Sequence, residues 1–177
     1  MDYFEAVDKR YSHKELFLPN AVPASDLERI ARAGLSAPTG GNSQCVRLVI
    51  LKDKETLRPL CEASPHAGLA SAPAAIALLT DSRVISGDLN FEVEDYSAAA
   101  TQMLLAATAL GYVSLWLDSP YFDQDKQQAA LSALGAPLGC HLWATLPIGQ
   151  PAGAGSRRAK LPYNQRAFYG KYGAGDL

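Results

Sequence analysis

EDYSAAATQMLLAATALGYVSLWLDS, residues 94–119, predicts a long helix that is followed directly by a buried strand. Between residues 95 and 110 apolar side chains recur at helical spacing, and the other positions are mostly Ala, Ser and Thr. A helix that is apolar on nearly every face lies at the centre of a fold or at a subunit interface. Gly111 is expected to end this helix, and residues 112–117 have the composition of a strand.

Further elements are predicted on both sides of this stretch. A helix is expected to begin at Ser25, with Glu28 in the capping-box position, and to end before Pro38. Strands are predicted at residues 45–51, 72–81 and 140–149. The first two do not alternate cleanly between apolar and polar residues, so we expect both to be buried on both faces.

Length and composition limit the class of protein. The chain has 177 residues, of which 48% are hydrophobic, which is enough for one domain with a real core. Sixteen basic and eighteen acidic residues leave a net charge of −2, so no global field attracts nucleic acid or an anionic membrane. Any bound anion must therefore be held by a local cluster of charges.

Cysteine usage and the N-terminus suggest a reducing compartment. Cys45, Cys61 and Cys140 form no C-x-x-C pair, which argues against a thiol redox motif or a zinc site. The first twenty residues contain acidic side chains and lack an apolar signal region, and the apolar run 103–117 is too short to span a bilayer. We therefore expect a cytoplasmic protein that binds no metal and no membrane.

A basic segment, DKRYSHKELF at residues 8–17, follows a short predicted helix. Arg10, Ser12 and Lys14 alternate, so in an extended backbone their side chains point the same way. A guanidinium, a hydroxyl and an ammonium group together match the oxygens of a phosphate monoester. The alternative is ordinary solvated surface charge.

A second basic group, Arg157, Arg158 and Lys160, lies in a late loop rich in Gly, Ala and Pro. The tail that follows it contains several aromatic residues but has too few apolar positions for a core of its own. Such a tail needs another surface on which to pack.

The segment LSAPTGGNSQ, residues 35–44, joins a helix end to a predicted strand. Small residues allow the backbone to approach a flat ligand, and the Asn and Gln amides offer both donors and acceptors. By itself the segment could equally be a turn. It is not a phosphate loop of the GK[ST] type.

Four blocks together resemble the FMN-dependent nitroreductases: KRYSHK, APTGGNSQ, residues 94–119 and RRAKLPYNQRAFYGKYG. They occur in the order of that family, and the similarity covers nearly the whole chain. The resemblance implies an α+β, three-layer nitroreductase-like fold with a mostly antiparallel sheet flanked by helices. It also implies a single domain, residues 1–177, that forms an intertwined homodimer in which residues 160–177 extend onto the partner subunit.

The resemblance also implies cofactor-binding residues. The phosphate and ribityl end of FMN would be held by the two basic segments, and the Gly-rich segment and the start of the central helix would approach the flavin from the partner subunit. Residues after the third strand would lie along the isoalloxazine, where a backbone N–H points at flavin N5. The residues, in this order, are Arg10, Tyr11, Ser12, Lys14, Arg158 and Lys160; Pro38, Thr39, Gly40, Asn42 and Asp95; and Leu117, Asp118 and Ser119.

The implied activity is an FMN-dependent NAD(P)H oxidoreductase. Hydride would pass from NAD(P)H to flavin N5 and then to a flat, electron-poor acceptor such as a nitroaromatic or a quinone, by ping-pong exchange. The flavin carries this chemistry, so no catalytic side chain is nominated. The alternatives are the same fold with a flavin-fragmenting or reductive dehalogenating reaction, and a non-enzymatic FMN-binding module.

The remaining polar residues have simpler explanations. Two alternatives stand for His66: a contact with the pyrimidine edge of the flavin, or the solvated state that is more common for a lone loop histidine. His141 lies in an apolar strand and is expected to be a core histidine. The acidic residues Glu92, Glu94 and Asp95 are explained by the helix macrodipole, with a further role implied only for Asp95. Cys45 is expected to be a buried, unreactive thiol.

Overall fold

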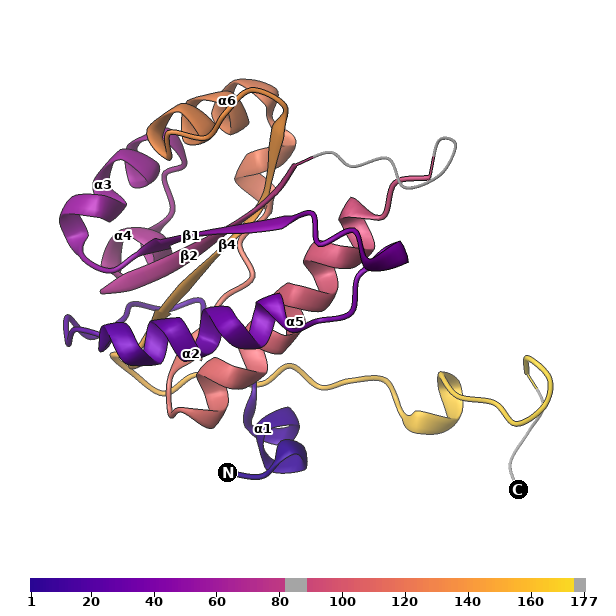
Figure 1. Cartoon of the computed structure of the whole chain (residues 1–177). Coiled ribbons are helices and arrows are strands. Elements are labelled where there is room, and N and C mark those ends of the chain that lie inside the picture. The colour runs from indigo at the N-terminus through magenta and orange to yellow at the C-terminus, as the bar shows by residue number, and fades with distance from the viewer. Residues whose placement is uncertain (82–88, 174–177) are drawn as a thin grey trace.

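A four-stranded antiparallel sheet lies between two layers of helices (Figure 1). The computed structural model describes residues 1–81 and 89–173. The strands are β1 (Val46–Leu51), β2 (Ala74–Asp81), β3 (Val113–Ser114) and β4 (Cys140–Gly149), and their order in the sheet is β1-β2-β4-β3. The predicted α+β fold with an antiparallel sheet flanked by helices is confirmed.

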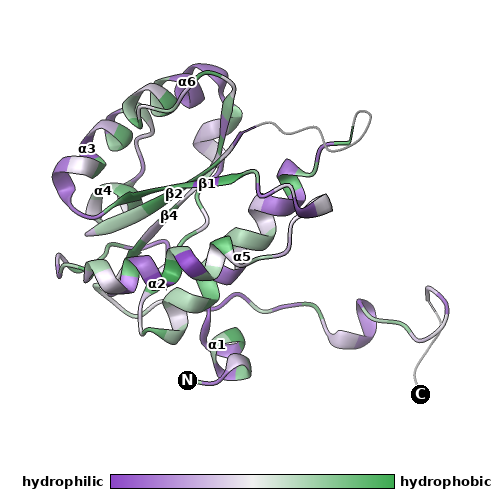
Figure 2. Cartoon of the chain, viewed as in Figure 1, coloured by the Kyte–Doolittle hydropathy of each residue, from purple (hydrophilic) through white to green (hydrophobic). Residues whose placement is uncertain are grey.

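The central strand β2 supplies side chains to both layers. Ile76 and Leu78 pack on one face with α2 (Ala24–Leu35) and α5 (Glu92–Ala109). Ala75, Ala77 and Leu79 pack on the other face with α3 (Lys54–Ala63), α4 (Ala67–Ser71) and α6 (Gln124–Ala133). Figure 2 shows that hydrophobic residues concentrate along β2 between these layers. This double burial explains why β2 lacks polar alternation.

Helix α5 is central, as its composition predicted. Ala99, Ala100 and Met103 are buried against the sheet and α2, and Gly34 of α2 has no room for a Cβ because Met103 lies against it. Gly111 ends the helix with φ of +87°, and the N–H of Tyr112 donates to the carbonyl of Ala107 at 2.9 Å. The predicted terminator is therefore confirmed.

The start of α5 corrects one interpretation. Glu92 is buried, and it accepts hydrogen bonds from the Thr80 hydroxyl and from Asn90 Nδ2 at 2.7 Å. Trp143 Nε1 donates to the same Thr80 oxygen at 2.8 Å. The helix macrodipole alone does not explain why Glu92 stands at this position, because the Glu92 carboxylate also links α5 to the end of β2 through Thr80. His141 is exposed and lies 3.5 Å from Glu92, so the prediction of a core histidine is wrong.

Three other local predictions are corrected. Helix α2 begins at Ala24 with Pro23 as its N-cap, so Ser25 does not cap it. Strand β1 lies at the sheet edge and is partly exposed, so it is not buried on both faces. The strand expected at residues 112–117 is reduced to Val113–Ser114, with an isolated bridge from Leu117 to Thr145, because β4 pairs with it only at these points.

The two ends of the chain expose aromatic side chains. Helix α1 (Tyr3–Lys9) presents Tyr3 and Phe4 to solvent, and the last part of the described chain runs away from the body of the domain (Figure 1). Tyr172 in this tail is 95% exposed. The part of the tail up to residue 173 therefore finds little packing surface among residues 1–81 and 89–173, and residues 174–177 lie outside the described residues.

No helix in the described part of the chain has both the length and the apolar character needed to cross a membrane. The residues described also include no cluster of three or more His, Cys, Asp or Glu side chains that could hold a metal ion.

A pair of isoleucines tests the sheet. Ile76 and Ile50 are directly paired between β2 and β1, but Ile76 is 0% exposed and Ile50 is 41% exposed. Ile76→Ala should lower the free energy of unfolding by about 2–5 kcal/mol, because it removes buried methyl groups and leaves a cavity. Ile50→Ala should cost less than about 1 kcal/mol. Urea denaturation at a fixed protein concentration measures both, and equal losses would contradict the assigned layers.

Candidate functional site

The basic segment after α1 is attached to the edge of the sheet. Helix α1 ends at Lys9, and Arg10 already has an extended backbone. Ser12 forms a parallel bridge with Ser114 of β3, and the N–H of His13 donates to the carbonyl of Ser114 at 3.0 Å. The sheet therefore holds Ser12 and His13 beside β3, and Arg10 and Lys14 lie directly on either side of this paired stretch.

The next residues hold the chain that leaves β4. Phe17 bridges Pro151, the N–H of Leu18 donates to the carbonyl of Gln150 at 2.8 Å, and the N–H of Ala152 donates to the carbonyl of Leu16 at 3.0 Å. This short antiparallel pairing directs the following residues back across the basic segment. Two stretches that are far apart in the sequence thus become neighbours.

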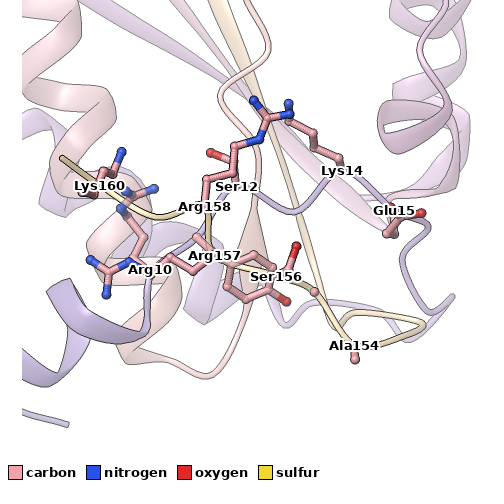
Figure 3. A pocket seen from close by; sticks show the side chains of 11 residues that line it. Arg10, Ser12, Lys14, Glu15, Ala154, Ser156, Arg157, Arg158 and Lys160 are labelled. Carbon is pink, nitrogen blue, oxygen red and sulfur yellow. The ribbon is translucent and has the colours of Figure 1, made fainter.

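Both basic segments line one open cavity of about 370 Å³ (Figure 3). The structure therefore brings together every residue predicted to hold the phosphate and ribityl end of a cofactor. In Figure 3, Arg10 and Lys160 lie at one end of the cavity, and the side chains of Lys14 and Arg158 reach its other end. The lining residues are Arg10, Tyr11, Ser12, Lys14, Glu15, Ala154, Gly155, Ser156, Arg157, Arg158 and Lys160.

Two contacts fix the late loop, residues 154–160, which we call the strap. Gly155 lies so close to Tyr11 that an added Cβ would overlap the tyrosine ring. Arg157 donates from its guanidinium to the carbonyl of Asp8 at 2.5 Å, at the end of α1. The sequence analysis named Arg157 as part of the second basic group but gave it no role in the site, and it did not nominate Gly155. Both act by positioning the strap.

The cations that face the cavity have no protein partner. Within residues 1–81 and 89–173, the side chains of Arg10, Lys14, Arg158 and Lys160 form no hydrogen bond and no ion pair. Arg157 differs, since it is bound to Asp8. Four unpaired positive charges in one cavity repel one another, and an anion relieves that repulsion.

The buried side chain of His13 stabilises the turn that follows this segment. Its ring is buried, its Nε2 lies 3.0 Å from the carbonyl oxygen of Leu16, and it packs edge-on against Phe17 with ring centroids 4.8 Å apart. The imidazole thereby closes the turn between Lys14 and Phe17. His13 is a positioning residue, because no part of it is accessible to a ligand.

The Gly-rich segment lines a different cavity, of about 450 Å³. Its backbone is sharply turned: Gly41, Asn42 and Gln44 have φ values of 55°, 56° and 49°. Pro38, Thr39 and Asn42 line the second cavity, whereas Gly40 packs against Phe91 instead. Arg47 also lines it and was not predicted. Within one chain, therefore, the Gly-rich segment does not join the cationic cavity.

Asp95 holds the Gly-rich segment in place. The residue is 2% exposed, and its carboxylate accepts hydrogen bonds from the Gly40 N–H at 2.7 Å, from the Ser43 hydroxyl and from the Cys45 thiol at 3.3 Å. Burial raises the pKa of the Cys45 thiol, which is consistent with the predicted unreactive cysteine. The direct contact between Asp95 and a flavin stays a prediction, but its support of this segment is a structural fact.

Residues 117–119 follow the strand that carries Ser114. Leu117 is buried, and its N–H and carbonyl are both paired with Thr145, at 3.1 and 2.8 Å. Leu117 therefore has no backbone donor left for a ligand. The N–H groups of Asp118 and Ser119 have no partner among the described residues, so any donor toward a flavin would have to come from these two positions. Both residues are at least partly accessible.

His66 has a local role. Its Nδ1 accepts a hydrogen bond from the N–H of Gly68 at 3.1 Å and so caps the start of α4. This contact accounts for the histidine without a ligand.

The sequence and the fold match known proteins. The model of the "Nitroreductase family" matches residues 7–83. A protein of Archaeoglobus fulgidus, named as a candidate NADH dehydrogenase/NAD(P)H nitroreductase, is 32% identical over 131 residues, which cover 73% of this chain and 75% of that protein. A protein of Methanothermobacter thermautotrophicus with the same name is 27% identical over 155 residues, 86% of this chain and 78% of that protein.

Solved structures agree in fold. The candidate NADH dehydrogenase/NAD(P)H nitroreductase from Bacteroides thetaiotaomicron has a TM-score of 0.82 and 26% identity, covering 96% of this chain and 98% of that chain. A nitroreductase family protein from Clostridium difficile has a TM-score of 0.81 and 25% identity, covering 97% and 99%. The similarity thus extends over almost the whole of each chain.

The strap provides a test with a matched control. Gly155→Ala should displace Arg158 and Lys160, so the FMN binding predicted from the sequence should weaken at least about tenfold through disturbed charge-assisted hydrogen bonds. Gly153→Ala should leave the affinity unchanged, since nothing lies within 4 Å of its added Cβ. Quenching of flavin fluorescence measures both affinities. Equal affinities in the two variants would show that the contact with Tyr11 does not position the cations.

A second test concerns Asp95. Asp95→Ala leaves the Gly40 N–H, the Ser43 hydroxyl and the Cys45 thiol without this acceptor, so unfolding should require about 3 kcal/mol less. Glu94→Ala removes an exposed charge from the same helical turn and should change stability by less than about 0.5 kcal/mol. Chemical denaturation compares the two, and Asp95→Asn should fall between them. A loss in Glu94→Ala as large as that in Asp95→Ala would refute the assigned role.

Proposed function

The chain belongs to the nitroreductase family, and from that membership we propose that it is an FMN-dependent NAD(P)H oxidoreductase. The observation that carries the proposal is the cationic cavity, in which two separate basic segments present four unpaired cations. We also propose that the reaction takes place in the cytoplasm and that the electron acceptor is small, flat and electron-poor.

The donors at the cavity fit the phosphate of FMN. Arg10 offers a planar fork, Lys14 a point charge and Ser12 a hydroxyl, and all three extend from a segment held by the sheet. The strap adds Arg158 and Lys160. A phosphate monoester bound here would exchange its hydration for charge-assisted hydrogen bonds and would relieve the repulsion among the cations.

The flavin ring would extend from this cavity toward residues 117–119. Ser12 is bridged to Ser114, and the chain runs from Ser114 directly to Asp118 and Ser119. When bound, the flavin supplies the hydride chemistry, accepting at N5 and passing the electrons to the acceptor. The backbone N–H groups of Asp118 and Ser119 would donate to the ring and so favour its reduced form.

We propose that the functional unit is a homodimer. The Gly-rich segment lies at a separate cavity, so it would meet the flavin of a partner subunit and not that of its own chain. The exposed tail supports this arrangement, because Leu161, Tyr163 and Tyr172 find no covering surface in the part of their own chain that the structure describes. The tail, residues 160–177, would pack across the partner.

The absorbance spectrum of the purified protein tests the cofactor and the reaction together. We expect a yellow protein that bleaches when NADH or NADPH is added without oxygen and recovers its colour with a quinone or a nitroaromatic compound. A colourless protein that takes up no added FMN would refute the proposal. Bound FMN that neither nucleotide reduces would indicate a non-enzymatic module, and slow bleaching with fast turnover of one specific substrate would indicate a specialised flavin reaction.

The opening segment provides the mutational test. Arg10→Ala combined with Lys14→Ala should weaken FMN binding by at least about a hundredfold, because two charge-assisted contacts to the phosphate are lost. The control is Arg29→Ala combined with Lys52→Ala, which removes the same charge outside the cavity. Equilibrium dialysis gives both affinities, and full retention of FMN by the first variant would contradict the site.

A further inference from the structure

Residues 117–121 form a short loop that is tied at both ends to one residue of β4, Thr145. At the first end, the N–H and the carbonyl of Leu117 are paired with the backbone of Thr145 at 3.1 and 2.8 Å. At the second end, the hydroxyl oxygen of Tyr121 lies 2.6 Å from the hydroxyl oxygen of Thr145. Tyr121 is 4% exposed and Thr145 is 0% exposed, so neither side chain is accessible to a ligand.

Tyr121 makes two further hydrogen bonds that hold this loop. Its N–H donates to the carbonyl of Asp118 at 2.8 Å, which closes a tight turn, and its carbonyl accepts from Gln127 Nε2 of α6 at 3.0 Å. Burial raises the pKa of the Tyr121 hydroxyl, so this group stays uncharged at neutral pH and keeps its proton for hydrogen bonding. The second end of the loop therefore depends on Tyr121.

The loop between the two ties has few backbone donors to offer. Pro120 has no N–H, and the N–H groups of Leu117 and Tyr121 are used within the protein. Among the described residues, the N–H groups of Asp118 and Ser119 have no partner. The orientation of these two donors is therefore set by a loop whose two ends are both fixed to β4.

We infer that Tyr121, through its hydrogen bond with Thr145, positions the backbone donors of residues 118–119 and thereby sets how strongly the site favours reduced over oxidised FMN. The inference rests on the proposed function, in which these donors face the flavin. A hydrogen bond weakens steeply as its donor turns away from the acceptor, so a loop held at one end only would lose part of this preference. Donors that are already fixed need no reorganisation when charge develops on the ligand.

The phosphate end of the proposed cofactor site is held by other contacts. Neither Tyr121 nor Thr145 lines the cationic cavity, and Tyr121 packs with Leu117 and Leu131 in the apolar layer that includes α6. Removing the Tyr121 hydroxyl should therefore change the preference for reduced flavin without releasing the phosphate. This separation distinguishes positioning of the donors from general damage to the fold.

The first experiment needs no cofactor. Tyr121→Phe keeps the ring and removes the hydroxyl, so hydrogen exchange of the backbone N–H at position 121 should become at least about threefold faster, as loss of one hydrogen bond predicts. Tyr112→Phe is the control, because it removes a hydroxyl that is bonded to Asp26 at 2.8 Å, and it should leave this rate unchanged. NMR on the full-length protein measures both rates. Unchanged exchange in Tyr121→Phe would overturn the inference.

The second experiment measures the two-electron midpoint potential of bound FMN by anaerobic titration against a reference dye. Tyr121→Phe should weaken the preference for reduced over oxidised FMN at least about threefold, which lowers the potential by about 14 mV. The affinity for oxidised FMN, measured by fluorescence quenching, should stay close to the wild-type value. Tyr112→Phe should change neither quantity.

Thr145 supplies the matched partner for this test. Thr145→Val removes the other hydroxyl and keeps the backbone pairing with Leu117, so it should lower the potential as much as Tyr121→Phe, and the two changes combined should add nothing further. Thr145→Ser retains a hydroxyl and should keep the wild-type potential. A smaller shift in either single variant, or additive shifts in the double variant, would overturn this inference alone. A wild-type protein that takes up no FMN would overturn the proposed function as well.

Discussion

The candidate site depends on backbone pairing between the N-terminal segment and the edge of the sheet. The bridge from Ser12 to Ser114, with the pairing of Leu16 and Leu18 to the chain after β4, uses backbone groups only. Each of these backbone hydrogen bonds adds a modest stabilisation, so the pairing contributes to folding as well as to the site. Because one pairing holds the first basic segment and the next directs the strap, both clusters of charge reach the same cavity.

Like charges gathered in this way lower the stability of the unliganded protein, because Arg10, Lys14, Arg158 and Lys160 have no counterions on the described chain. The surrounding contacts offset that cost. His13 closes the turn below the charges, Gly155 packs on Tyr11, and Arg157 fastens the strap to α1. The arrangement is thus organised before a phosphate arrives, so little ordering entropy remains to be lost on binding.

The Gly-rich segment shows a second use of a buried charge. Asp95 accepts three hydrogen bonds from one short stretch of chain, and Gly40 fits against Phe91 only because it lacks a side chain. A carboxylate removed from water is stable when its lone pairs are satisfied and when it lies near a helix N-terminus. The segment is therefore rigidly presented at the second cavity, which suits a surface that another subunit must meet.

Local sequence determined the elements whose signals are short-range. The helical spacing of residues 95–110, the stop at Gly111, the strand at residues 140–149 and the alternation of Arg10, Ser12 and Lys14 were all legible, because each depends on neighbours within a few positions. Only the tertiary structure decided which partners they meet. The exposure of His141, the edge position of β1, the pairing of Leu117 and the contact of Gly155 with Tyr11 all depend on which distant segments lie alongside. Sheet order and long-range packing set those neighbours, and no spacing within a single segment encodes them.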